Sequence, residues 1–274
     1  MNPVSVVLAI IFLSFASAVA QDAGQDAVDR GSRTAKDGFQ NEDDIRDRFN
    51  SWQSDSNAQA WLKAMGHDVS RIQSVRAEKP HGEKADVEVT VKAQTADGGS
   101  AERVERISIK LVSTATGFNQ IDKRWLAAYA EKWRMPQEVV SALKLFVGES
   151  PPVKGSRTEG RMYLNELPES TQQAVLTFFT KKKDEIISDL LAGAGEHSAN
   201  WMMVTLKGDR KARWVIRSMK DTVRCFGDGP VEMTKAGNLK IGHITMQRKG
   251  GDNGRETAKM LQFKVNPVLL FDAE

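Results

Sequence analysis

The sequence predicts an α/β (α+β) domain in which helices flank a central mixed β-sheet. Three observations support this fold class. Apolar residues recur at helical spacing early in the chain, they alternate with polar residues over 86–112, and short apolar runs between glycine-rich turns fill the last third. Helices and strands in this order are typical of a layered domain around one sheet. With 274 residues, 40% of them hydrophobic, the chain is long enough to bury a substantial core.

Local signals place the elements in order. A first helix is predicted to begin at Asn41, an N-cap residue followed by acids, and a second to run from Asp55 to Met65. Alternation then predicts two strands, Asp86–Val91 and Val104–Val112. The remaining predicted elements are a helix over about 122–147 interrupted near Pro136, with Trp125, Ala128, Tyr129 and Trp133 as its apolar stripe, a long helix over about 168–192, and short strands at Trp201–Leu206 and Trp214–Ser218.

Composition excludes some classes of site and leaves the partner open. The formal net charge is +3, which is a mild basic excess and does not by itself indicate nucleic acid. The single cysteine cannot form an internal disulfide, and four histidines with one cysteine do not make a zinc site.

The N-terminal segment has two interpretations. The apolar run Val4–Ala20 ends in small residues and is typical of a secretory signal, but the first seven residues carry no Lys or Arg, so a start at Val28 is the alternative. We therefore expect a signal-like or wrongly assigned extension at 1–27 and a polar linker at 28–40. A single domain is predicted over 41–274, with the catalytic core in 41–150 and the recognition part in 151–274.

Two strands carry a combination of side chains that suits phosphodiester hydrolysis. Asp86 opens one strand, and Ser108 and Lys110 project from one face of the next, because Ile109 between them points the other way. Carboxylate and carbonyl oxygens hold Mg²⁺, and a lysine orients or deprotonates water. We expect one or two Mg²⁺ ions per active site, held by Asp86 and the backbone carbonyl of Ile109, with Glu42 and Glu88 as the further candidate ligands. Ser108 is a poor metal ligand.

Two other segments have the composition of DNA-contacting surfaces: residues 117–125, the first DNA-contacting block, and residues 244–255, the C-terminal block. Both combine amides, which read base edges, with cations, which hold phosphates, and the first adds an aromatic ring that can wedge between base pairs. A helix cap in the first segment and a hairpin turn at 252–254 in the second are the structural alternatives. The candidate DNA-binding residues are Phe118, Asn119, Gln120, Lys123, Arg124, Gln247, Arg248, Lys249 and Arg255.

With these residues the chain, from about Asn41 to Asp272, resembles type II restriction endonucleases of the PD-(D/E)xK class, specifically the HinP-type enzymes that cut GCGC. The MspI-type enzymes, which cut CCGG, are the next most similar. The resemblance implies a restriction-endonuclease-like core and Mg²⁺-dependent cleavage of double-stranded DNA that leaves 5′-phosphate ends. Asp86 would be the metal-binding acid and Lys110 the catalytic lysine, while Ser108 stands where such enzymes place Glu, Gln or Asn.

The resemblance also implies a setting for the protein. A cognate DNA methyltransferase would be its genetic partner, it would act in the cytoplasm without a membrane partner, and it would be a monomer or a homodimer. The start at Val28 is then favoured. Two alternatives remain at this stage: an exported, less specific nuclease if the N-terminal run is a signal, and a sequence-specific DNA-binding protein whose catalysis is weakened by Ser108.

Overall fold

The computed structural model describes residues 36–80, 84–153, 155–208, 211–251 and 255–273. The expectations for the extension at 1–27, for most of the linker and for the turn at 252–254 therefore lie outside the described residues. Within the described ranges, no helix is long and apolar enough to cross a membrane.

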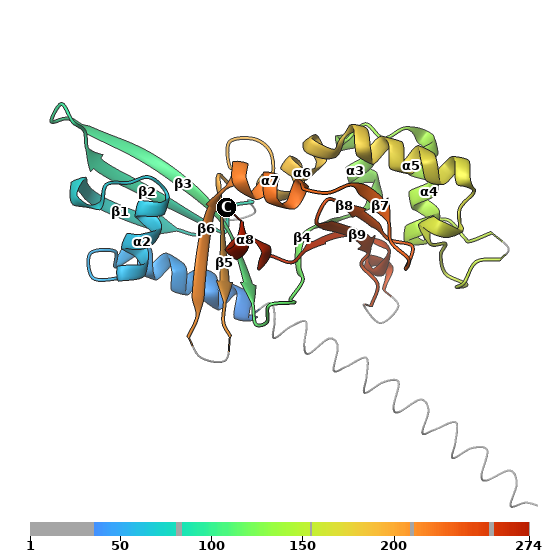
Figure 1. The fold of residues 1–274 in the computed structure, drawn as a ribbon, viewed down its shortest axis with the longest axis horizontal. Helices are drawn as coiled ribbons and strands as arrows, with labels where there is room; N and C mark the ends of the chain where they lie inside the picture. The colour runs from blue at the N-terminus through green and yellow to red at the C-terminus, as the bar shows by residue number, and fades with distance from the viewer. Residues whose placement is uncertain (1–35, 81–83, 154, 209–210, 252–254, 274) are drawn as a thin grey trace, which may run out of the picture.

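Two five-stranded sheets form the framework, the first on the left of Figure 1 and the second on the right. The first sheet, in the order β1-β2-β3-β5-β6, is mixed, because β3 and β5 are parallel and its other pairs are antiparallel. The second, in the order β4-β10-β9-β8-β7, is antiparallel throughout. The strands are β1 (Ile72–Glu78), β2 (Val87–Gln94), β3 (Ser100–Val112), β4 (Asn119–Arg124), β5 (Trp201–Leu206), β6 (Arg213–Ser218), β7 (Val231–Met233), β8 (Leu239–Ile241), β9 (Ile244–Arg248) and β10 (Leu261–Val265).

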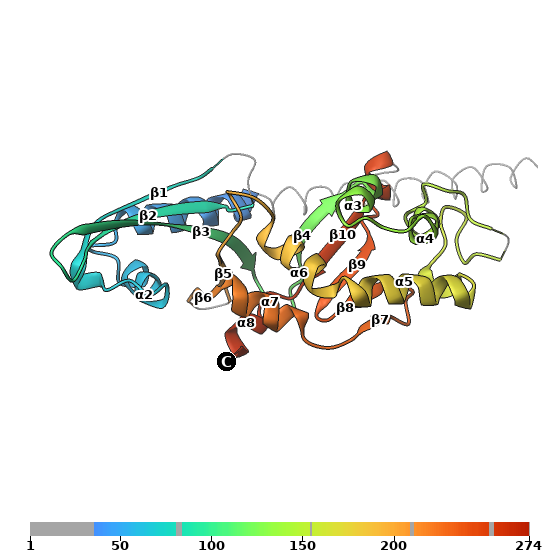
Figure 2. The same cartoon turned by 90° about the horizontal axis from the view of Figure 1, so that it is seen from above.

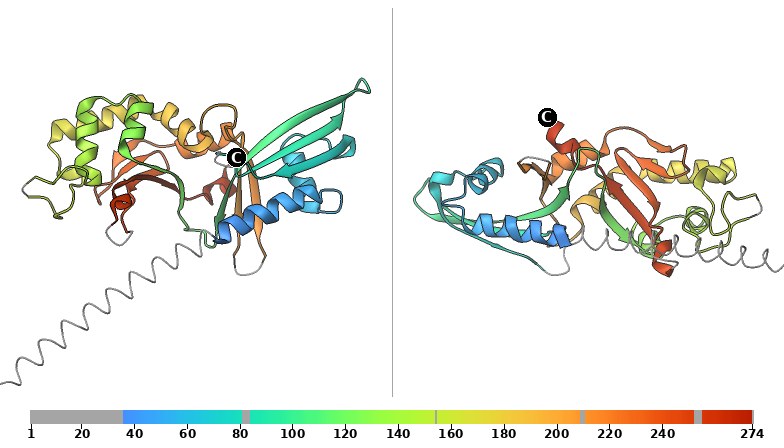
Figure 3. Two further views of the ribbon diagram at one scale, coloured as in Figure 1. Left: turned by 180° about the vertical axis from the view of Figure 1, so that it is seen from behind. Right: turned by 90° about the horizontal axis from the view of Figure 1, so that it is seen from below.

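Helices flank both sheets, so the predicted fold class is confirmed. A helix over residues 36–50 and α2 accompany the first sheet, and α3 to α6 gather around the second, as the view from above shows (Figure 2). The short C-terminal helix lies where the two sheets meet, which is visible from behind and from below (Figure 3). The named helices are α2 (Ser56–Ala64), α3 (Leu126–Lys132), α4 (Gln137–Val147), α5 (Glu169–Lys181), α6 (Lys183–Ala192), α7 (Met219–Gly227) and α8 (Leu269–Asp272).

Strand β5 separates two hydrophobic cores. Met203 packs into the core under the first sheet, with Ile45 and Phe49 of the helix 36–50, whereas Met202 and Val204 pack into the larger core of the second half. Because successive side chains of a strand point to opposite faces, a strand that is apolar on both sides can join two cores. This explains the nearly continuous apolar run of β5.

The first helix begins earlier than predicted. Residues 36–40, expected to belong to a linker, are helical, and Asn41 is an interior residue with only 6% of its surface exposed. The extra turn is held by a contact that is distant in sequence: the Lys79 ammonium lies 5.6 Å from the centre of the Phe39 ring. Tertiary contacts therefore extend the helix past Asn41, and this residue does not act as its N-cap.

The segment from Asp122 to Arg124 is part of a strand, and the prediction of a helix there was wrong. β10 pairs with it, with Leu261 opposite Arg124 and Gln262 opposite Lys123, and this long-range pairing overrides the local signal. The helix starts only at Leu126. As a result two residues of the predicted apolar stripe are exposed, Trp125 and Ala128, while Tyr129 and Trp133 are buried as expected.

The predicted long helix over 168–192 is two helices. Lys182, with φ −102° and ψ 9°, separates α5 from α6. Both helices have broad apolar faces, since α5 buries Phe178 and Phe179 and α6 buries Ile186 and Ile187. The break lets each helix direct its own face at the core.

Candidate active site

Asp86 is fixed just before β2 by hydrogen bonds to the neighbouring strand. Its backbone N–H donates to the carbonyl of Ile107 at 2.9 Å, and its Oδ2 accepts from the backbone N–H of Ile109 at 2.5 Å. Both contacts follow from the β2–β3 register, in which Val87 lies opposite Ile107. The carboxylate is thereby held against the backbone of β3, beside the predicted polar-x-Lys motif.

The three predicted catalytic side chains meet at this point. The Lys110 Nζ lies 2.9 Å from the carbonyl oxygen of Ile109, 3.2 Å from the Ser108 Oγ and 3.6 Å from the Asp86 Oδ2. The Ser108 hydroxyl donates to the same Asp86 oxygen at 3.3 Å. Ile107 and Ile109 pack into the core of the first sheet, so alternation along β3 sends Ser108 and Lys110 to the other face.

The two further candidate ligands differ in position. Burial raises the pKa of Glu42, the nearby charge of Asp86 raises it further, and the hydrogen bond from Lys79, 2.9 Å away, opposes both. The carboxylate of Glu42 thus lies within electrostatic reach of the predicted metal-binding acid. Glu88 instead accepts from the Arg106 Nε at 2.9 Å. Over the described ranges, no group of three or more His, Cys, Asp or Glu residues is placed to hold a metal ion.

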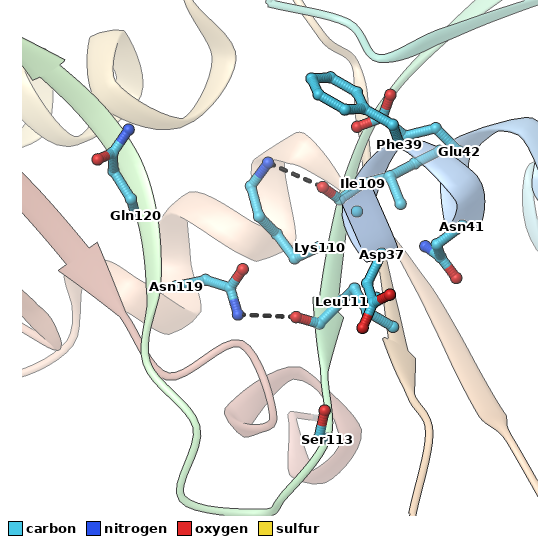
Figure 4. A pocket seen from close by; sticks show the side chains of 11 residues that line it. Asp37, Phe39, Asn41, Glu42, Ile109, Lys110, Leu111, Ser113, Asn119 and Gln120 are labelled. Atoms are coloured by element: carbon cyan, nitrogen blue, oxygen red, sulfur yellow. Dashed lines mark hydrogen bonds between the residues drawn. The ribbon is translucent and has the colours of Figure 1, made fainter. Parts of the chain in front are cut away.

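Two cavities adjoin this cluster, and Lys110 and Gln120 line both. The first, about 370 Å³, lies between the helix 36–50, β3 and β4. In Figure 4 the Lys110 side chain projects from β3 into the space between the two strands, and Asn119 faces it from β4. The second, about 480 Å³, is lined by Asp86, Ser108, Asp122 and Lys123 among others. The cluster of Asp86, Ser108 and Lys110 is therefore open to a ligand along β4.

Lys84 also lines the second cavity, and the sequence reasoning missed it. Its Nζ donates to the carbonyl of Ile121 in β4 at 2.8 Å and to that of Leu190 in α6 at 2.5 Å. Burial, and then the charge of Lys110, lower the pKa of Lys84 to about 8. A lysine two residues before the predicted acid was the available signal, but nothing in the local pattern indicated that it would be buried.

The predicted DNA-contacting block forms β4 and the loop before it. Phe118 is 59% exposed. The Asn119 amide donates to the carbonyl of Leu111 at 3.0 Å, which ties the start of β4 to the end of β3. Lys123 follows on β4, and the Arg124 Nε donates to Asp122 at 3.2 Å. The aromatic ring, the amides and the cations thus lie along one strand next to the catalytic cluster.

The C-terminal block divides between two faces of β9. Gln247 and Arg248 project from opposite faces by alternation, and Lys249 follows directly after the strand. Burial, and then the charge of Arg161, lower the pKa of Arg248. Its Nε is buried without a hydrogen-bond partner in the part of the chain that the structure describes. Arg255, which is exposed, follows the undescribed residues 252–254.

Comparisons with known proteins agree with this geometry. The family model described as R.HinP1I restriction endonuclease matches residues 65–271, three quarters of the chain. Among solved structures, the crystal structure of the restriction endonuclease MspI in complex with its cognate DNA superposes with a TM-score of 0.61 and 14% sequence identity, covering 90% of this chain and 97% of that one. A search of the curated proteins found no match.

The family match includes Asp86 and the strand that carries Ser108 and Lys110, and the similarity to MspI covers 90% of the chain. The predicted family is thus confirmed. The chain belongs to the R.HinP1I restriction endonuclease family and is a type II site-specific deoxyribonuclease.

Proposed function

We propose that this enzyme cleaves double-stranded DNA at a short GC-rich palindrome, GCGC, in a Mg²⁺-dependent reaction that leaves 5′-phosphate ends. The single observation that carries the proposal is the cluster at the start of β2. There the Asp86 Oδ2, the Ile109 carbonyl oxygen and the Ser108 Oγ all lie within 3.6 Å of the Lys110 ammonium. An acid, a carbonyl oxygen and a lysine beside a cavity are the groups that phosphodiester hydrolysis needs.

The oxygen atoms of this cluster fit a hard divalent cation. A positive charge, the Lys110 ammonium, already lies among the oxygens of Asp86 and Ile109. We assign the Asp86 carboxylate and the Ile109 carbonyl as ligands and Glu42, close by, as the third oxygen donor. When bound, Mg²⁺ would stabilise the negative charge on the phosphate and lower the pKa of a water molecule.

The protein's own groups supply the remaining steps. Lys110 orients the attacking water and neutralises the charge that develops on the phosphate oxygens. Ser108, whose hydroxyl donates to Asp86, keeps that carboxylate turned toward the site and takes no metal-ligand role. A buried neutral hydroxyl suits this work, since Ser108 is only 1% exposed.

DNA binding is proposed along β4 and the adjoining strands. Phe118 is exposed enough to wedge between base pairs, Gln120 and Gln247 offer amides to base edges, and Lys123 and Lys249 offer cations to phosphates. The MspI structure contains that enzyme's cognate DNA, which supports a DNA-binding face on this fold. Arg124 and Arg255 are the remaining candidates for phosphate contact, with Asn119 as a positioning amide, whereas Arg248 lies on the other face of β9 and is left out of this surface.

A nuclease of this kind needs a partner that protects the chromosome. We propose a DNA methyltransferase with the same recognition sequence as the genetic partner and the cytoplasm as the shared compartment. A palindromic site is compatible with a homodimer or with a monomer that cuts one strand at a time.

End sequencing tests the proposal. Unmethylated lambda DNA is incubated with the protein in Mg²⁺ and in Ca²⁺, and the fragment ends are sequenced and checked for 5′-phosphates. We expect discrete fragments in Mg²⁺, ends at GCGC, and binding without cutting in Ca²⁺. Ends at CCGG or another site would overturn the proposed specificity, and intact DNA in Mg²⁺ would overturn the proposed reaction.

A further inference from the structure

Three glutamine side chains form a hydrogen-bonded row across the second sheet. The Gln247 Nε2 donates to the Gln262 Oε1 at 3.3 Å, and the Gln262 Nε2 donates to the Gln120 Oε1 at 2.6 Å. The three residues lie on β9, β10 and β4, which are neighbouring strands. This amide row therefore connects the C-terminal block, which contains Gln247, with the first DNA-contacting block, which contains Gln120.

The middle member of the amide row is the buried one. Gln262 is 7% exposed, Gln247 is half-buried and Gln120 is exposed. A buried amide must satisfy both its oxygen and its nitrogen, and Gln262 does so with its two neighbours. Turning its amide over would place two carbonyl oxygens in contact at Gln120 and two amino groups in contact at Gln247. The orientations of the three amides are therefore linked.

The linkage decides what each end of the amide row offers to a ligand. The Gln120 Oε1 accepts the hydrogen bond from Gln262, so the Gln120 Nε2, a donor, is the group left for a ligand. The Gln247 Nε2 donates a hydrogen bond to Gln262, so at this end of the amide row the Gln247 Oε1, an acceptor, is the group left for a ligand. Base edges differ in their order of donors and acceptors, so a fixed amide orientation discriminates between them.

The amide row also lies on the face that the proposed function assigns to DNA. Leu261 and Phe263, the neighbours of Gln262 on β10, pack into the core, so alternation turns Gln262 to the opposite face. In the strand register Gln262 lies opposite Lys123 on one side and Gln247 on the other. Gln120, at one end, lines both cavities beside Lys110.

We propose that Gln262 is a specificity-determining positioning residue: it links the amide orientations of Gln120 and Gln247, so that one presents a donor where the other presents an acceptor, and so sets which base edges they accept. This inference rests on the proposed function, in which that face meets DNA. The competing explanation is that Gln262 only satisfies its own polar atoms in a packed sheet. The two explanations differ in what a change of its hydrogen-bonding capacity does to sequence preference.

Two variants of Gln262 separate the explanations. Gln262→Glu has only acceptor oxygens, so Gln247 can still donate, but Gln120 must turn its amide over and direct its oxygen outward. Gln262→Met keeps the length of the side chain and removes both hydrogen bonds. Gln173→Glu is the matched control. Gln173 is exposed on α5 and its amide donates to Thr177, and its replacement by Glu changes the net charge by the same amount.

The readout is the ratio of cleavage rates at the preferred site and at sites that differ from it by one base pair, measured by end sequencing under single-turnover conditions. We expect this ratio to change by about 10- to 100-fold in Gln262→Glu, which is the size of one lost bidentate base contact. Gln262→Met should lower discrimination toward several bases at once, and Gln173→Glu should keep the preference of the wild type. An added negative charge by itself slows cleavage at all sequences alike.

The inference is overturned if both Gln262 variants keep the wild-type ratio while their rates fall uniformly. Thermal unfolding is measured in parallel, and if Gln262→Glu does not fold, Gln120→Glu replaces it. A carboxylate at 120 still accepts from Gln262 and directs an oxygen outward, so it should shift the preference in the same direction. A failure of the proposed function is distinguishable, because the wild type and Gln173→Glu would then cut no DNA. That result would overturn this inference as well, since it rests on the proposed function.

Discussion

At the scale of single residues, the proposed active site rests on which atom each side chain contacts. Asp86 accepts from the backbone of Ile109 and from the hydroxyl of Ser108, and Lys110 contacts both Asp86 and Ser108. A serine at this position therefore acts through its neighbours. It adds a hydrogen bond where a longer polar residue would add a ligand.

Removing that hydroxyl should weaken catalysis without abolishing it. In Ser108→Ala the Asp86 carboxylate loses one donor, and we expect the single-turnover cleavage rate to fall by about tenfold, equivalent to about 1.4 kcal/mol. Ser141→Ala, at an exposed position on α4 that lines neither cavity, should cut at the wild-type rate. A wild-type rate for Ser108→Ala would show that Asp86 needs no orienting hydroxyl.

A second cluster of residues stabilises the fold and is sensitive to pH. Glu105 is 1% exposed and accepts hydrogen bonds from His67 at 2.9 Å and from the Trp201 indole at 2.7 Å. Burial alone would raise the pKa of Glu105, but the hydrogen bonds from His67 and Trp201 and the charge of Arg103 outweigh it, so the pKa lies below its ordinary value of 4.5.

Because the pKa of Glu105 is lower in the folded than in the unfolded state, its carboxylate stabilises the fold above the unfolded pKa, and this contribution is lost as the pH falls through the folded pKa. We expect Glu105→Gln to lower the free energy of unfolding by about 2 kcal/mol at pH 7. Denaturant titrations should show the difference from the wild type shrinking below about pH 4.5. Glu102→Gln, on the exposed part of β3, is the control, and a difference independent of pH would contradict this assignment.

At the scale of elements, sequence reasoning identified most helices and strands, but it missed β1 and did not predict pairings between distant parts of the chain. Alternation along two neighbouring strands predicted that Asp86, Ser108 and Lys110 would come close together, and the observed register of Val87 opposite Ile107 brings them together. β4 was mistaken for a helix because its partner β10 lies far along the chain. Lys84 and Gln262 were missed for the same reason, since their contacts join segments separated by long stretches of sequence.

Lys84 connects the strand that leads to Asp86 with β4 and α6, and Gly193 makes room for it. A Cβ atom at Gly193 would lie 2.9 Å from the Lys84 Cβ, whereas one at Gly195 would meet nothing within 4 Å. Both glycines have positive φ, +77° and +87°. Replacing either by alanine strains the backbone, but only the first also displaces Lys84.

We therefore expect Gly193→Ala to be less stable than Gly195→Ala by about 1–2 kcal/mol, the usual cost of overpacking. Denaturant titration of the two variants measures this difference directly. Equal losses of stability would mean that the Lys84 side chain shifts freely and does not depend on the space at Gly193.

At the scale of the whole molecule, each sheet takes strands from both ends of the chain. β5 and β6 complete the first sheet, and β4 joins the second, so the predicted division at residue 150 crosses both sheets. The Arg217 Nε also donates to the carbonyl of Leu270 in α8, which holds the C-terminal helix to the first sheet. The catalytic and recognition parts are thus interleaved.

This interleaving predicts how the protein responds to a cut in the loop between α4 and α5. If a protease site is inserted after Ser150 and cleaved, we expect the two fragments to stay associated in size-exclusion chromatography and to separate only in denaturant. The intact chain with the same insertion is the control. Fragments that elute separately and each unfold cooperatively would show two independent domains.

In the proposed function the oxygens around Asp86 form the metal-dependent cleavage site, and two acids at the start of β2 allow a direct test of this assignment. Asp86, just before β2, and Glu88, on β2, lie two residues apart and both carry a carboxylate, but Asp86 contacts Lys110 and Glu88 is paired with Arg106. The measurement is single-turnover cleavage in Mg²⁺, with DNA binding in Ca²⁺, of Asp86→Asn and Glu88→Gln. We predict that Asp86→Asn binds DNA and loses cleavage by at least about 10³-fold, while Glu88→Gln cuts within a few-fold of the wild type. Cleavage that survives in Asp86→Asn would rule out Asp86 as the metal-binding acid, and loss of cleavage in Glu88→Gln would assign that role to Glu88.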